Sequence, residues 1–517
     1  MSLNPSPALA ALLSFIFPGA GQVYAGELRR GVAWAMPMLL FIVAVIWLLL
    51  GGQRALLELG FDPEKRLALL VLNAAFFLYH VAAMLDAYRI ARTERQRGFG
   101  RISGSSPIAL AALVAVAIVL HGVPEVYGWQ VHNGIGGLLP GDGGEVIPSF
   151  SPRPSQSPTT PPSITPTPIS SPSATPSSPN TPGTPPPTGS GTPGATASPR
   201  VCEPIDLAGW GMAADGRVNL LLVGSDSRSD EGAGEASIRT DSMMLLSIDV
   251  ASCKGALFSF PRNMRQGEYP AWFHIPLENG QEYPGYLFGL WRDAAASPQN
   301  YPGSEGIGSE CQQAFDCARG WRALTGAIQN MVGVQVDGIV AVNLKGFVDV
   351  VDNLPGGGLW VDIPYALYDD AYFNSQQEKM LVDFQKGCQF LNGEESLAFA
   401  RSRHQDSDYQ RARRQQLLLQ QVRKQLDPLG LLPHIPALLQ VAQTNLFMTL
   451  QQSDIPYLAQ VASRIDADRL YRFDFAPARM DRLGSMDAMV DKVNNIFSEP
   501  EPNPTTKPNQ EPCPPRN

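Results

Sequence analysis

Hydrophobic residues form long runs in the first 130 residues of the chain and short runs after them. Three of the long runs, residues 31–51, 67–88 and 107–127, contain almost no charged side chain. A helix needs roughly 20 apolar residues to cross about 30 Å of hydrocarbon. We therefore expect three membrane-spanning helices, and with them an α-helical membrane domain over residues 1–130.

A fourth apolar segment, residues 8–26, is interrupted by Pro18, Gly19 and Gly21. Proline and glycine both disfavour an uninterrupted helix. The segment could therefore span the membrane, re-enter it or lie in its interface, and these three topologies stay open. Because no charged region precedes the segment and further spans follow it, we do not expect a cleaved signal peptide.

The loop between the second and third spans indicates which side of the membrane each part occupies. Residues 89–101 hold five arginines and one glutamate, and basic loops remain in the cytoplasm. The third span then leads outward, so everything after about Gly128 is expected outside. Buried core helices of a soluble protein are the alternative, but they need neither this apolar length nor this charge bias.

Residues 151–200 have the composition of a spacer, because 37 of these 50 residues are Pro, Ser or Thr. Such a segment cannot bury enough apolar surface to fold. Fully extended at roughly 3 Å per residue, it could hold the next domain on the order of 150 Å from the bilayer. We expect a linker over residues 131–200, a globular domain over 201–497 and a disordered tail over 498–517.

The cysteines agree with this topology, because all six follow the apolar spans. An even number of cysteines in an oxidising compartment indicates disulfides. Cys311 and Cys317 form the most plausible local pair, although sequence alone does not define the connectivity. A zinc site is not supported, since no CxxC or histidine spacing accompanies the cysteines. The six residues are Cys202, Cys253, Cys311, Cys317, Cys388 and Cys513.

From Arg217 onward, short apolar runs alternate with helical stretches, which is typical of an α/β domain. We expect strands at residues 217–225, 242–250, 255–261, 336–343 and 358–364. We expect helices at residues 315–333, 344–354, 392–400 and 407–426. Asn392 is a suitable N-cap for the third helix, because Glu394 and Glu395 follow it.

Charge is concentrated in one place, since the chain carries a net charge of -9 yet residues 400–416 contain five arginines. On the expected helix 407–426, Arg411, Arg414 and Gln415 share the stripe that continues as apolar residues, whereas Arg413 faces solvent. Arg401 and Arg403 lie two apart in a segment expected to be extended, so they would share one side.

Such a cluster needs either an anion or buried carboxylates to neutralise it. A structural ion-pair network with Asp406 and Asp408 is the alternative to an anion site. The sequence upstream favours the anion, because the charged motif GSDSR directly follows an expected strand, RTD begins the next one and FPRN ends a third. Ligand sites of α/β domains gather at such ends.

Two of the residues in these motifs, Asp226 and Asp241, suit Mg²⁺, which takes one or two carboxylates together with phosphate oxygens and water. Arginine side chains suit the phosphates through forked, charge-assisted hydrogen bonds. The assembly therefore favours phosphoryl transfer, in which positioning and charge neutralisation do most of the work.

Five ordered motifs closely resemble those of the LytR-CpsA-Psr family of cell-wall ligases: VNLLLVGSDSR, IRTDSMMLLSID, LFSFPRN, VDGIVAVNLKGFVDVVDNLPGG and LNGEESLAFARSRHQDSDYQRARRQQ. The resemblance covers about residues 217–452 and implies an extracytoplasmic α/β/α sandwich with a central mixed sheet. Members of that family bind polyprenyl-pyrophosphate-linked glycans and transfer the glycan phosphate to peptidoglycan or to another acceptor.

Carried over residue by residue, the resemblance implies a magnesium site at Asp226 and Asp241. It also implies that Arg262 and Arg403 act beside these aspartates in catalysis. Arg228 and Arg414 are weaker candidates, because either could brace the acidic residues instead. The pyrophosphate-binding residues that the resemblance implies are Arg239, Arg262, Arg401, Arg403, Arg411 and Gln415.

The sequence departs from the family in three ways. Asn263 stands where an aspartate is usual after the PR motif, and its amide can form hydrogen bonds but cannot carry charge or act as a base. The lysine often found between the third strand and the next helix is missing, and Arg292 is the nearest substitute. The chain has three or four apolar segments where most relatives have one span, and FPGAGQVYAGELRRGVAW resembles small membrane modules.

The residues predict a magnesium-dependent phosphotransferase outside the cell membrane, and the resemblance implies that it acts on a polyprenyl-pyrophosphate glycan and an envelope acceptor such as peptidoglycan. A pyrophosphate hydrolase would use the same site. A non-catalytic lipid-pyrophosphate sensor is the alternative of another class, and Asn263 and the missing lysine keep it open. A regulator that binds DNA conflicts with the predicted topology and with the acidic chain.

Overall fold

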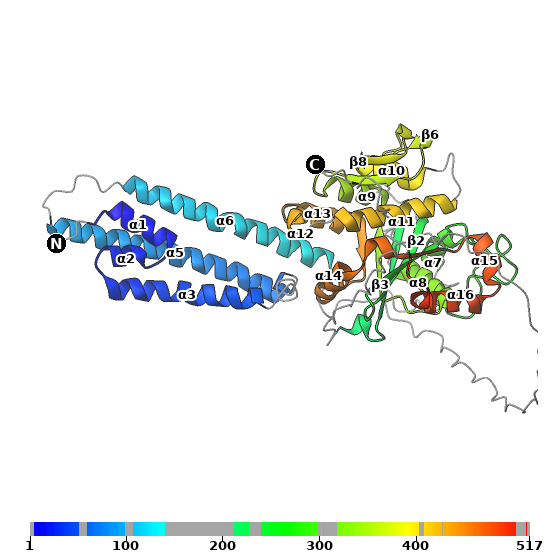
Figure 1. Cartoon of the computed structure of the whole chain (residues 1–517), viewed down its shortest axis with the longest axis horizontal. Helices are drawn as coiled ribbons and strands as arrows, with labels where there is room; N and C mark the ends of the chain where they lie inside the picture. Colours follow the sequence, from blue (N-terminus) through cyan, green and yellow to red (C-terminus); the bar gives the residue numbers. More distant parts are fainter. Residues whose placement is uncertain are drawn as a thin grey trace, which may run out of the picture.

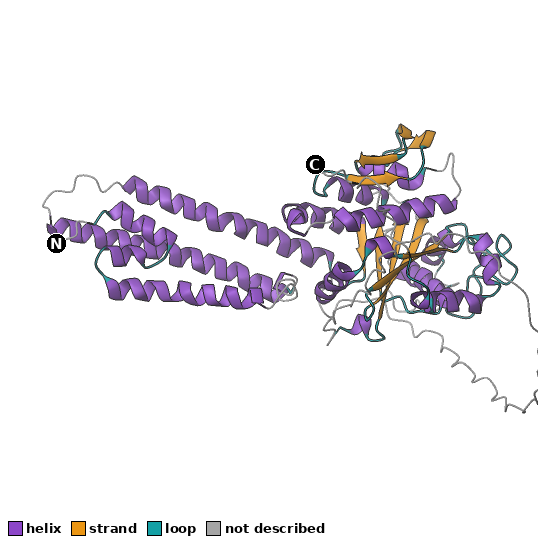
Figure 2. Cartoon of the chain, in the orientation of Figure 1, coloured by secondary structure: helices purple, strands orange, loops and turns teal. Residues whose placement is uncertain are grey.

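A computed structural model shows an elongated helical unit followed by an α/β unit (Figures 1 and 2). The structure describes residues 5–50, 59–60, 62–98, 107–139, 210–226, 239–297, 301, 318–402, 408–425, 428–502 and 513. The Pro-rich segment 151–200 lies outside these residues.

Three helices are long and apolar enough to cross a membrane, as the sequence predicts: α3 (Leu28–Leu50), α5 (Pro63–Gly98) and α6 (Pro107–Leu138). The interrupted N-terminal segment forms two short helices, α1 (Pro7–Ile16) and α2 (Ala20–Tyr24). At 1.5 Å per residue, α1 is only about 15 Å long, which is half of the hydrocarbon thickness. This segment therefore does not cross the membrane as one helix.

Gly19 lies at the break between α1 and α2 and has a φ of 103°. This left-handed conformation is costly for any residue with a Cβ atom. A Cβ atom here would also overlap the backbone oxygen of Gly31 in α3. The glycine thus permits both the sharp turn and the close approach of α3.

The α/β unit is built on a six-stranded mixed sheet with the order β10-β3-β2-β1-β4-β9. Strand β1 is antiparallel to β2 and parallel to β4, and β3 is antiparallel to β2 and parallel to β10. The strands are β1 (Arg217–Ser225), β2 (Thr240–Asp249), β3 (Lys254–Phe260), β4 (Gly338–Val342), β9 (Leu446–Met448) and β10 (Tyr471–Asp474).

Helices cover both faces of this sheet, so the expected α/β/α sandwich is confirmed (Figure 2). Alternate residues of β1 point to opposite faces: Leu221 joins the core under one helical layer, and Leu220 joins the core under the other. The first layer contains α7 (Leu290–Ala296), α8 (Ala318–Val332), α15 (Pro477–Leu483) and α16 (Met486–Asn494). The second contains α13 (Ile435–Asn445) and α14 (Ile455–Arg464).

Two antiparallel hairpins form a smaller unit with its own apolar core, which we call the hairpin unit. Its strands are β5 (Leu359–Ile363), β6 (Leu367–Phe373), β7 (Lys379–Phe384) and β8 (Gly387–Leu391). Its helices are α9 (Leu344–Asp352) and α10 (Gly393–Arg401). Helix α11 (Asp408–Gln425) lies between the hairpin unit and the six-stranded sheet, and the short α12 (Pro428–Leu431) follows it (Figure 1).

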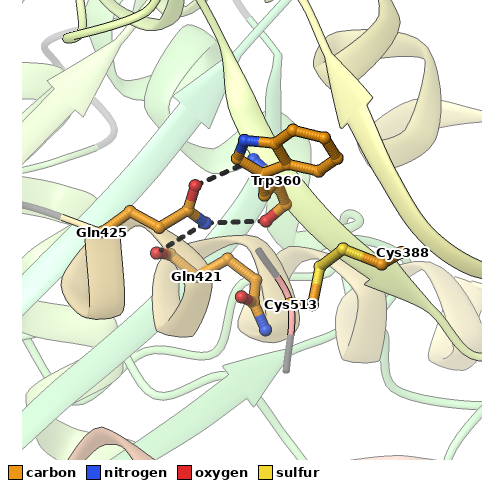
Figure 3. The surroundings of a disulfide bond; sticks show 5 residues. All are labelled: Trp360, Cys388, Gln421, Gln425 and Cys513. Carbon is orange, nitrogen blue, oxygen red and sulfur yellow. Dashed lines mark hydrogen bonds between the residues drawn. A yellow bond between two sulfur atoms is a disulfide. The ribbon is translucent and has the colours of Figure 1, made fainter. Parts of the chain in front are cut away.

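Polar side chains fix α11 against both of its neighbours. The Gln425 side chain accepts from the Trp360 amide nitrogen at 2.9 Å and donates to the Trp360 carbonyl oxygen at 2.7 Å, which attaches the helix to β5 (Figure 3). Gln416 is buried and donates to the Ser259 hydroxyl of β3 at 2.7 Å. These bonds fix the rotation of α11 about its axis, and therefore the direction in which its arginines point.

The C-terminal tail is attached to the same region by a disulfide between Cys388 of β8 and Cys513, at a sequence separation of 125 (Figure 3). Cys253 is also disulfide-bonded. The expected pair Cys311–Cys317 lies outside the described residues. The prediction that the external cysteines form disulfides is thus confirmed for the cysteines that the structure describes.

The long apolar helices contact the α/β unit directly. Helix α6 continues beyond the expected end of the span, and Ile135 and Leu139 near its end are buried in the core with Leu220 of β1. The Gln452 side chain donates to the Leu139 carbonyl oxygen at 3.0 Å and accepts from Arg66 at 3.0 Å. Packing against α5 and α6 therefore holds the domain close to the helical unit, whereas the linker alone would allow a distant position.

Candidate active site

Asp226 and Asp241 lie next to each other because the ends of β1 and β2 are paired. The register places Ser225 opposite Thr240. Just beyond this pair, the Asp226 amide nitrogen donates to the Arg239 carbonyl oxygen at 3.1 Å, and the Arg239 amide nitrogen donates to Asp226 Oδ1 at 2.8 Å. These two bonds hold both aspartates at one edge of the sheet, as the sequence predicts.

The electrostatics of Asp226 reflect this proximity. Burial raises the pKa of the Asp226 carboxyl, and the nearby charge of Asp241 raises it further. The guanidinium groups of Arg239 and Arg401 act in the opposite direction on the same pKa. The two carboxylates and two of the predicted arginines therefore lie within one electrostatic environment.

Arg262 follows the end of β3 and forms a salt bridge to Asp241 Oδ1. Its guanidinium also lies over the Phe288 ring, 4.9 Å from the ring centroid. A cation held between a carboxylate and an aromatic face has little freedom to move. Arg262 is thus placed beside the aspartates, as expected.

Helix α11 presents two of its predicted residues to the aspartates. Arg411 is 5% exposed, and its guanidinium donates to the Asp241 carbonyl oxygen at 3.4 Å. The Ser242 hydroxyl donates to Gln415 Oε1 at 2.8 Å. The Arg413 side chain is 62% exposed and lies 3.7 Å from the Asp474 carboxylate. The helical stripe inferred from the sequence is therefore confirmed.

Arg414 contacts other side chains and the backbone of the protein and does not line the cavity described below. Its side chain is 1% exposed, donates to the Ser402 carbonyl oxygen and lies over the Phe399 ring at 5.7 Å. The Ser402 hydroxyl in turn donates to Asp369 Oδ2 at 2.7 Å. Arg414 thus braces the end of α10 against the hairpin unit, which agrees with its weaker standing as a binding candidate.

A cavity of about 490 Å³ opens between the edge of the sheet and the hairpin unit. Four predicted site residues line it, while Asp226, Arg239 and Arg262 lie beside the lining residue Asp241. Arg228 and Arg403 lie outside the described residues. The lining residues are Asp241, Asp369, Ala371, Tyr372, Phe373, Arg401, Ser402, Arg411 and Gln415.

The local structure at Arg401 differs from the expectation. Arg401 is the last residue of α10, and Ser402, with ψ of 139°, is the first residue outside the helix. The extended segment expected to hold Arg401 and Arg403 on one side therefore does not include Arg401. The start of this helix is fixed as the sequence predicts, because Asn392 and Glu395 form a capping box, and its end lies one residue beyond the expected Ala400.

The hairpin unit contributes site residues that sequence reasoning missed, among them Tyr372, Phe373 and Asp369 of β6. Burial raises the pKa of the Tyr372 hydroxyl to about 12, although the nearby Arg401 lowers it. Tyr372 is therefore a neutral hydroxyl at pH 7. The segment LYDDAYF carries neither a strand-end charge pair nor a helical stripe, so the sequence offered no signal for it.

The sequence departs from the family at two positions near the third strand, and the structure shows the surroundings of Asn263 and of Arg292, the nearest substitute for the missing lysine. Asn263 Oδ1 is buried and accepts no hydrogen bond from the described residues. Arg292 pairs with its neighbour Asp293 at 3.0 Å and is absent from the cavity lining. Arg292 therefore does not replace the missing lysine at this cavity.

A divalent cation fits the donor set at Asp226 and Asp241. Oδ1 of each carboxylate is engaged, whereas Oδ2 of neither accepts a hydrogen bond from the residues that the structure describes. Within the same residues, no three His, Cys, Asp or Glu side chains gather into a metal site. A cation here would complete its coordination with water or phosphate oxygens, as Mg²⁺ commonly does.

Comparison with known proteins decides the family. A model of the LytR_cpsA_psr family matches residues 196–267 and 291–493, which together exceed half of the chain. The chain belongs to the LytR_cpsA_psr family. The resemblance of the five sequence motifs is thereby confirmed.

Individual members of the LytR_cpsA_psr family are distant. An uncharacterized protein of Staphylococcus aureus is 32% identical over 247 residues, which cover 47% of this chain and 51% of that protein. The polyisoprenyl-teichoic acid–peptidoglycan teichoic acid transferase TagT of Bacillus subtilis is 25% identical over 264 residues, which cover 50% and 69%. The chain thus spans about half the length of the first of these relatives.

Two further proteins show similarly low sequence identity to this chain. The cell wall biosynthesis protein LcpA of Corynebacterium glutamicum is 27% identical over 208 residues, covering 38% of this chain and 36% of that protein. The crystal structure of Bacillus subtilis TagV matches 54% of this chain and 98% of its own, with 18% identity and a TM-score of 0.36.

Proposed function

We propose that this protein is an extracytoplasmic transferase that moves a glycan phosphate from a polyprenyl-pyrophosphate carrier to peptidoglycan or another cell-envelope acceptor. The observation that carries the proposal is the cavity in which Arg401, Arg411 and Gln415 face Asp241. Membership of the LytR_cpsA_psr family and the likeness to named teichoic acid transferases support the same reaction class.

The arginines are suited to hold the pyrophosphate. Arg401 and Arg411 enter the cavity from two different helices, so their guanidinium groups can bind phosphate oxygens from two directions. Arg262 is fixed by Asp241 and by the Phe288 ring, so it adds positive charge at a constant position. The acceptor hydroxyl would attack the sugar-linked phosphorus, and polyprenyl phosphate would leave.

Asp226 and Asp241 would hold Mg²⁺, whose charge would neutralise the pyrophosphate oxygens when both are bound. The described residues assign no general base. Tyr372 stays protonated at pH 7, because burial raises the pKa of its hydroxyl to about 12. It is therefore suited to donate a hydrogen bond to the bound phosphate rather than to remove a proton.

The membrane helices support a site outside the cell. The basic loop between α5 and α6 favours a cytoplasmic position for that end of the helices. Helix α6 then leads outward, and its far end is packed against the α/β unit. A multi-pass protein in this orientation would meet both a lipid-linked glycan and the cell wall.

Two arginines of α11 provide a matched test. Arg411→Gln removes a charge that lines the cavity, while Arg413→Gln removes an exposed charge two residues away. A charge-assisted hydrogen bond contributes about 1.5–3 kcal/mol, so we expect kcat/KM to fall about 10- to 100-fold in Arg411→Gln. Arg413→Gln is expected to retain the activity of the native protein.

The assay would use the full chain in liposomes with a polyprenyl-pyrophosphate glycan, Mg²⁺ and peptidoglycan. Linked product from the native protein supports the transferase. Release of glycan phosphate that does not change when acceptor is added would instead identify a hydrolase. Binding of the lipid without any turnover would identify a sensor and overturn the proposal.

A further inference from the structure

Polar residues form a connected group inside the helices that are long enough to span the membrane. Asn73 and His80 lie on α5, seven residues apart and therefore on one face of that helix. His121 and Glu125 lie on α6, four residues apart and also on one face. Placing an ionisable side chain inside the hydrocarbon of a membrane costs free energy. Such side chains therefore commonly mark functional sites.

The two histidines are linked to each other and to fixed acceptors. His80 Nδ1 lies 3.3 Å from His121 Nε2. The other ring nitrogen of His80, Nε2, lies 2.6 Å from the Phe15 carbonyl oxygen of α1. The other ring nitrogen of His121, Nδ1, lies 3.0 Å from Asn73 Oδ1. Both outer contacts of this histidine dyad therefore end on oxygen atoms.

The orientation of the Asn73 amide is fixed by its other neighbours. Asn73 Nδ2 donates to the His121 carbonyl oxygen at 3.0 Å and to Glu125 Oε2 at 2.7 Å. Rotating the amide by half a turn would place Oδ1 against two acceptors. Asn73 Oδ1 therefore faces His121 as an acceptor, as the Phe15 carbonyl oxygen faces His80.

The charge of the dyad follows from the number of N–H protons that its three contacts require. The two outer contacts each need a proton on a ring nitrogen, and the contact between the rings needs a third. Two neutral imidazoles carry only one N–H each. With two protons, one of the three contacts would bring two lone pairs together. The geometry is satisfied only when the pair of rings holds one additional proton and a charge of +1.

The surroundings suit this charge. The Phe15 ring is stacked on His80 at 5.4 Å, and the Phe76 and Phe77 rings lie 6.0 and 5.8 Å from His121. Aromatic faces within about 6 Å attract cations. Glu125 offers a carboxylate on the far side of Asn73. Within the structure, His80 is 6% exposed and His121 is half-buried.

Few other titratable groups face the dyad. On α5, the Tyr79 hydroxyl donates to the Trp34 carbonyl oxygen of α3, and Asp86 lies six residues beyond His80 with Trp34 and Gln22 as partners. Helix α1 contributes only the Phe15 carbonyl, because its sequence PALAALLSFI holds no ionisable residue. Glu125 is therefore the acidic group connected to the dyad, through Asn73.

We propose that His80 and His121 form a proton-binding site within the membrane helices, which holds one excess proton between the two rings with Glu125 as its counter-ion. The bound proton connects α1, α5 and α6, because all three helices contribute to the three contacts. This site is separate from the catalytic cavity, and its existence does not depend on the proposed transferase reaction.

Nitrogen-15 NMR of the full chain in proteoliposomes, with labelled histidine rings, tests the proton count. An ordinary histidine with a pKa near 6.5 is only about one-tenth cationic at pH 7.5. We expect a cationic imidazole signal at pH 7.5 from one pair of coupled rings. The signal should disappear in His80→Gln and in His121→Gln and remain in the control His132→Gln, which alters another histidine of α6.

Glu125→Gln tests the counter-ion. Without the carboxylate, the excess proton should be lost at a pH at least one unit lower than in the native protein, which is a tenfold weaker proton affinity. A native spectrum that shows only neutral rings at pH 7.5 would overturn the proposal, whatever the variants do. A cationic signal that survives both dyad substitutions would overturn it as well.

Discussion

Arg411 and Arg413 show how much the position of a single residue decides in this site. Both belong to α11, yet Arg411 is 5% exposed and reaches Asp241, whereas the Arg413 side chain is 62% exposed and pairs with Asp474. Arg414, one residue further, is buried against Ser402 and Phe399. Three neighbouring arginines thus differ in role because a helix turns by about 100° per residue.

Asp226 is the residue at which pH and metal binding should be coupled. Burial and the charge of Asp241 raise the pKa of its carboxyl, so Asp226 becomes protonated at a higher pH than an ordinary aspartate. Protons should therefore compete with Mg²⁺ as the pH falls. We expect the Mg²⁺ concentration for half-maximal transfer to rise on acidification, and to rise at least about tenfold in Asp226→Asn at pH 7.5.

The measurement is a Mg²⁺ titration of the transfer rate at several pH values. Asn retains an oxygen that can accept from the Arg239 amide, so the backbone bonds at this edge of the sheet should remain. An Asp226→Asn variant with the same Mg²⁺ dependence as the native protein would remove Asp226 from the proposed metal site. The Asp241 carboxylate would then have to bind the ion by itself.

At the scale of elements, the sequence predicts the parts of the fold that have a strong local pattern. The buried runs of β1, β2 and β3 and the helical periods of α8 to α11 appear close to their expected positions. The aspartates at their ends could therefore be assigned to one site. Arg401 belongs to the end of α10, whereas the sequence analysis places it in the extended segment that follows. The capping box at Asn392 marks where this helix starts, but no sequence signal marks where it ends.

The hairpin unit could not be predicted in the same way. In β6, buried and exposed residues alternate irregularly, and the buried positions include Asp369. Strand β6 pairs with the neighbouring β7, but the hairpin is packed against Leu418 of α11, which is a contact between distant parts of the chain. Tyr372 and Asp369 reach the cavity only through that packing, so periodicity could not identify them.

The junction between β1 and β4 contains a half-buried carboxyl group, that of Asp337, whose ionisation is unfavourable. It allows a test of how stability depends on pH. Asp337 accepts from the Asn219 amide nitrogen of β1 at 2.7 Å, and burial raises the pKa of its carboxyl from 3.8 to about 7. The folded state therefore holds this proton more tightly than the unfolded state. The resulting stability is present below pH 4 and is lost as the pH rises through 7.

Asp337→Asn should remove this dependence, because the amide is neutral and keeps an oxygen for the Asn219 N–H. We expect the free energy of unfolding of the variant to exceed that of the native protein increasingly from pH 5 to pH 8, by about 1–2 kcal/mol after discounting for the exposed part of the side chain. Thermal unfolding of the full chain in detergent at both pH values measures it. An equal difference at pH 5 and pH 8 would contradict the assignment.

At the scale of the whole molecule, α6 determines how far the α/β unit stands from the membrane. Its 32 residues extend about 48 Å at 1.5 Å per residue, which exceeds the roughly 30 Å of hydrocarbon. The remaining length carries Ile135 and Leu139 into the core shared with β1. The cavity that we propose to bind a lipid-linked substrate is thus kept near the long apolar helices, although the intervening linker is long enough to release the domain.

The contact between α6 and α13 allows a direct test of this arrangement. A Cβ atom at Gly134 would lie 2.9 Å from the Cβ atom of Leu439, whereas a Cβ atom at Gly136 would meet nothing within 4 Å. Disulfides require Cβ atoms about 3.5–4.5 Å apart. After a small shift of the helices, the pair Gly134→Cys and Leu439→Cys should form a disulfide, while Gly136→Cys with Leu439→Cys should not.

A specific protease site inserted into residues 151–200 makes the cross-link visible, because after cleavage only the disulfide joins the membrane helices to the α/β unit. We expect the two fragments of the 134/439 variant to migrate together without reductant and apart with it. Fragments of the 136/439 variant should separate in both conditions. If both variants separate equally, the domain does not rest on α6, and its distance from the membrane is determined by the linker.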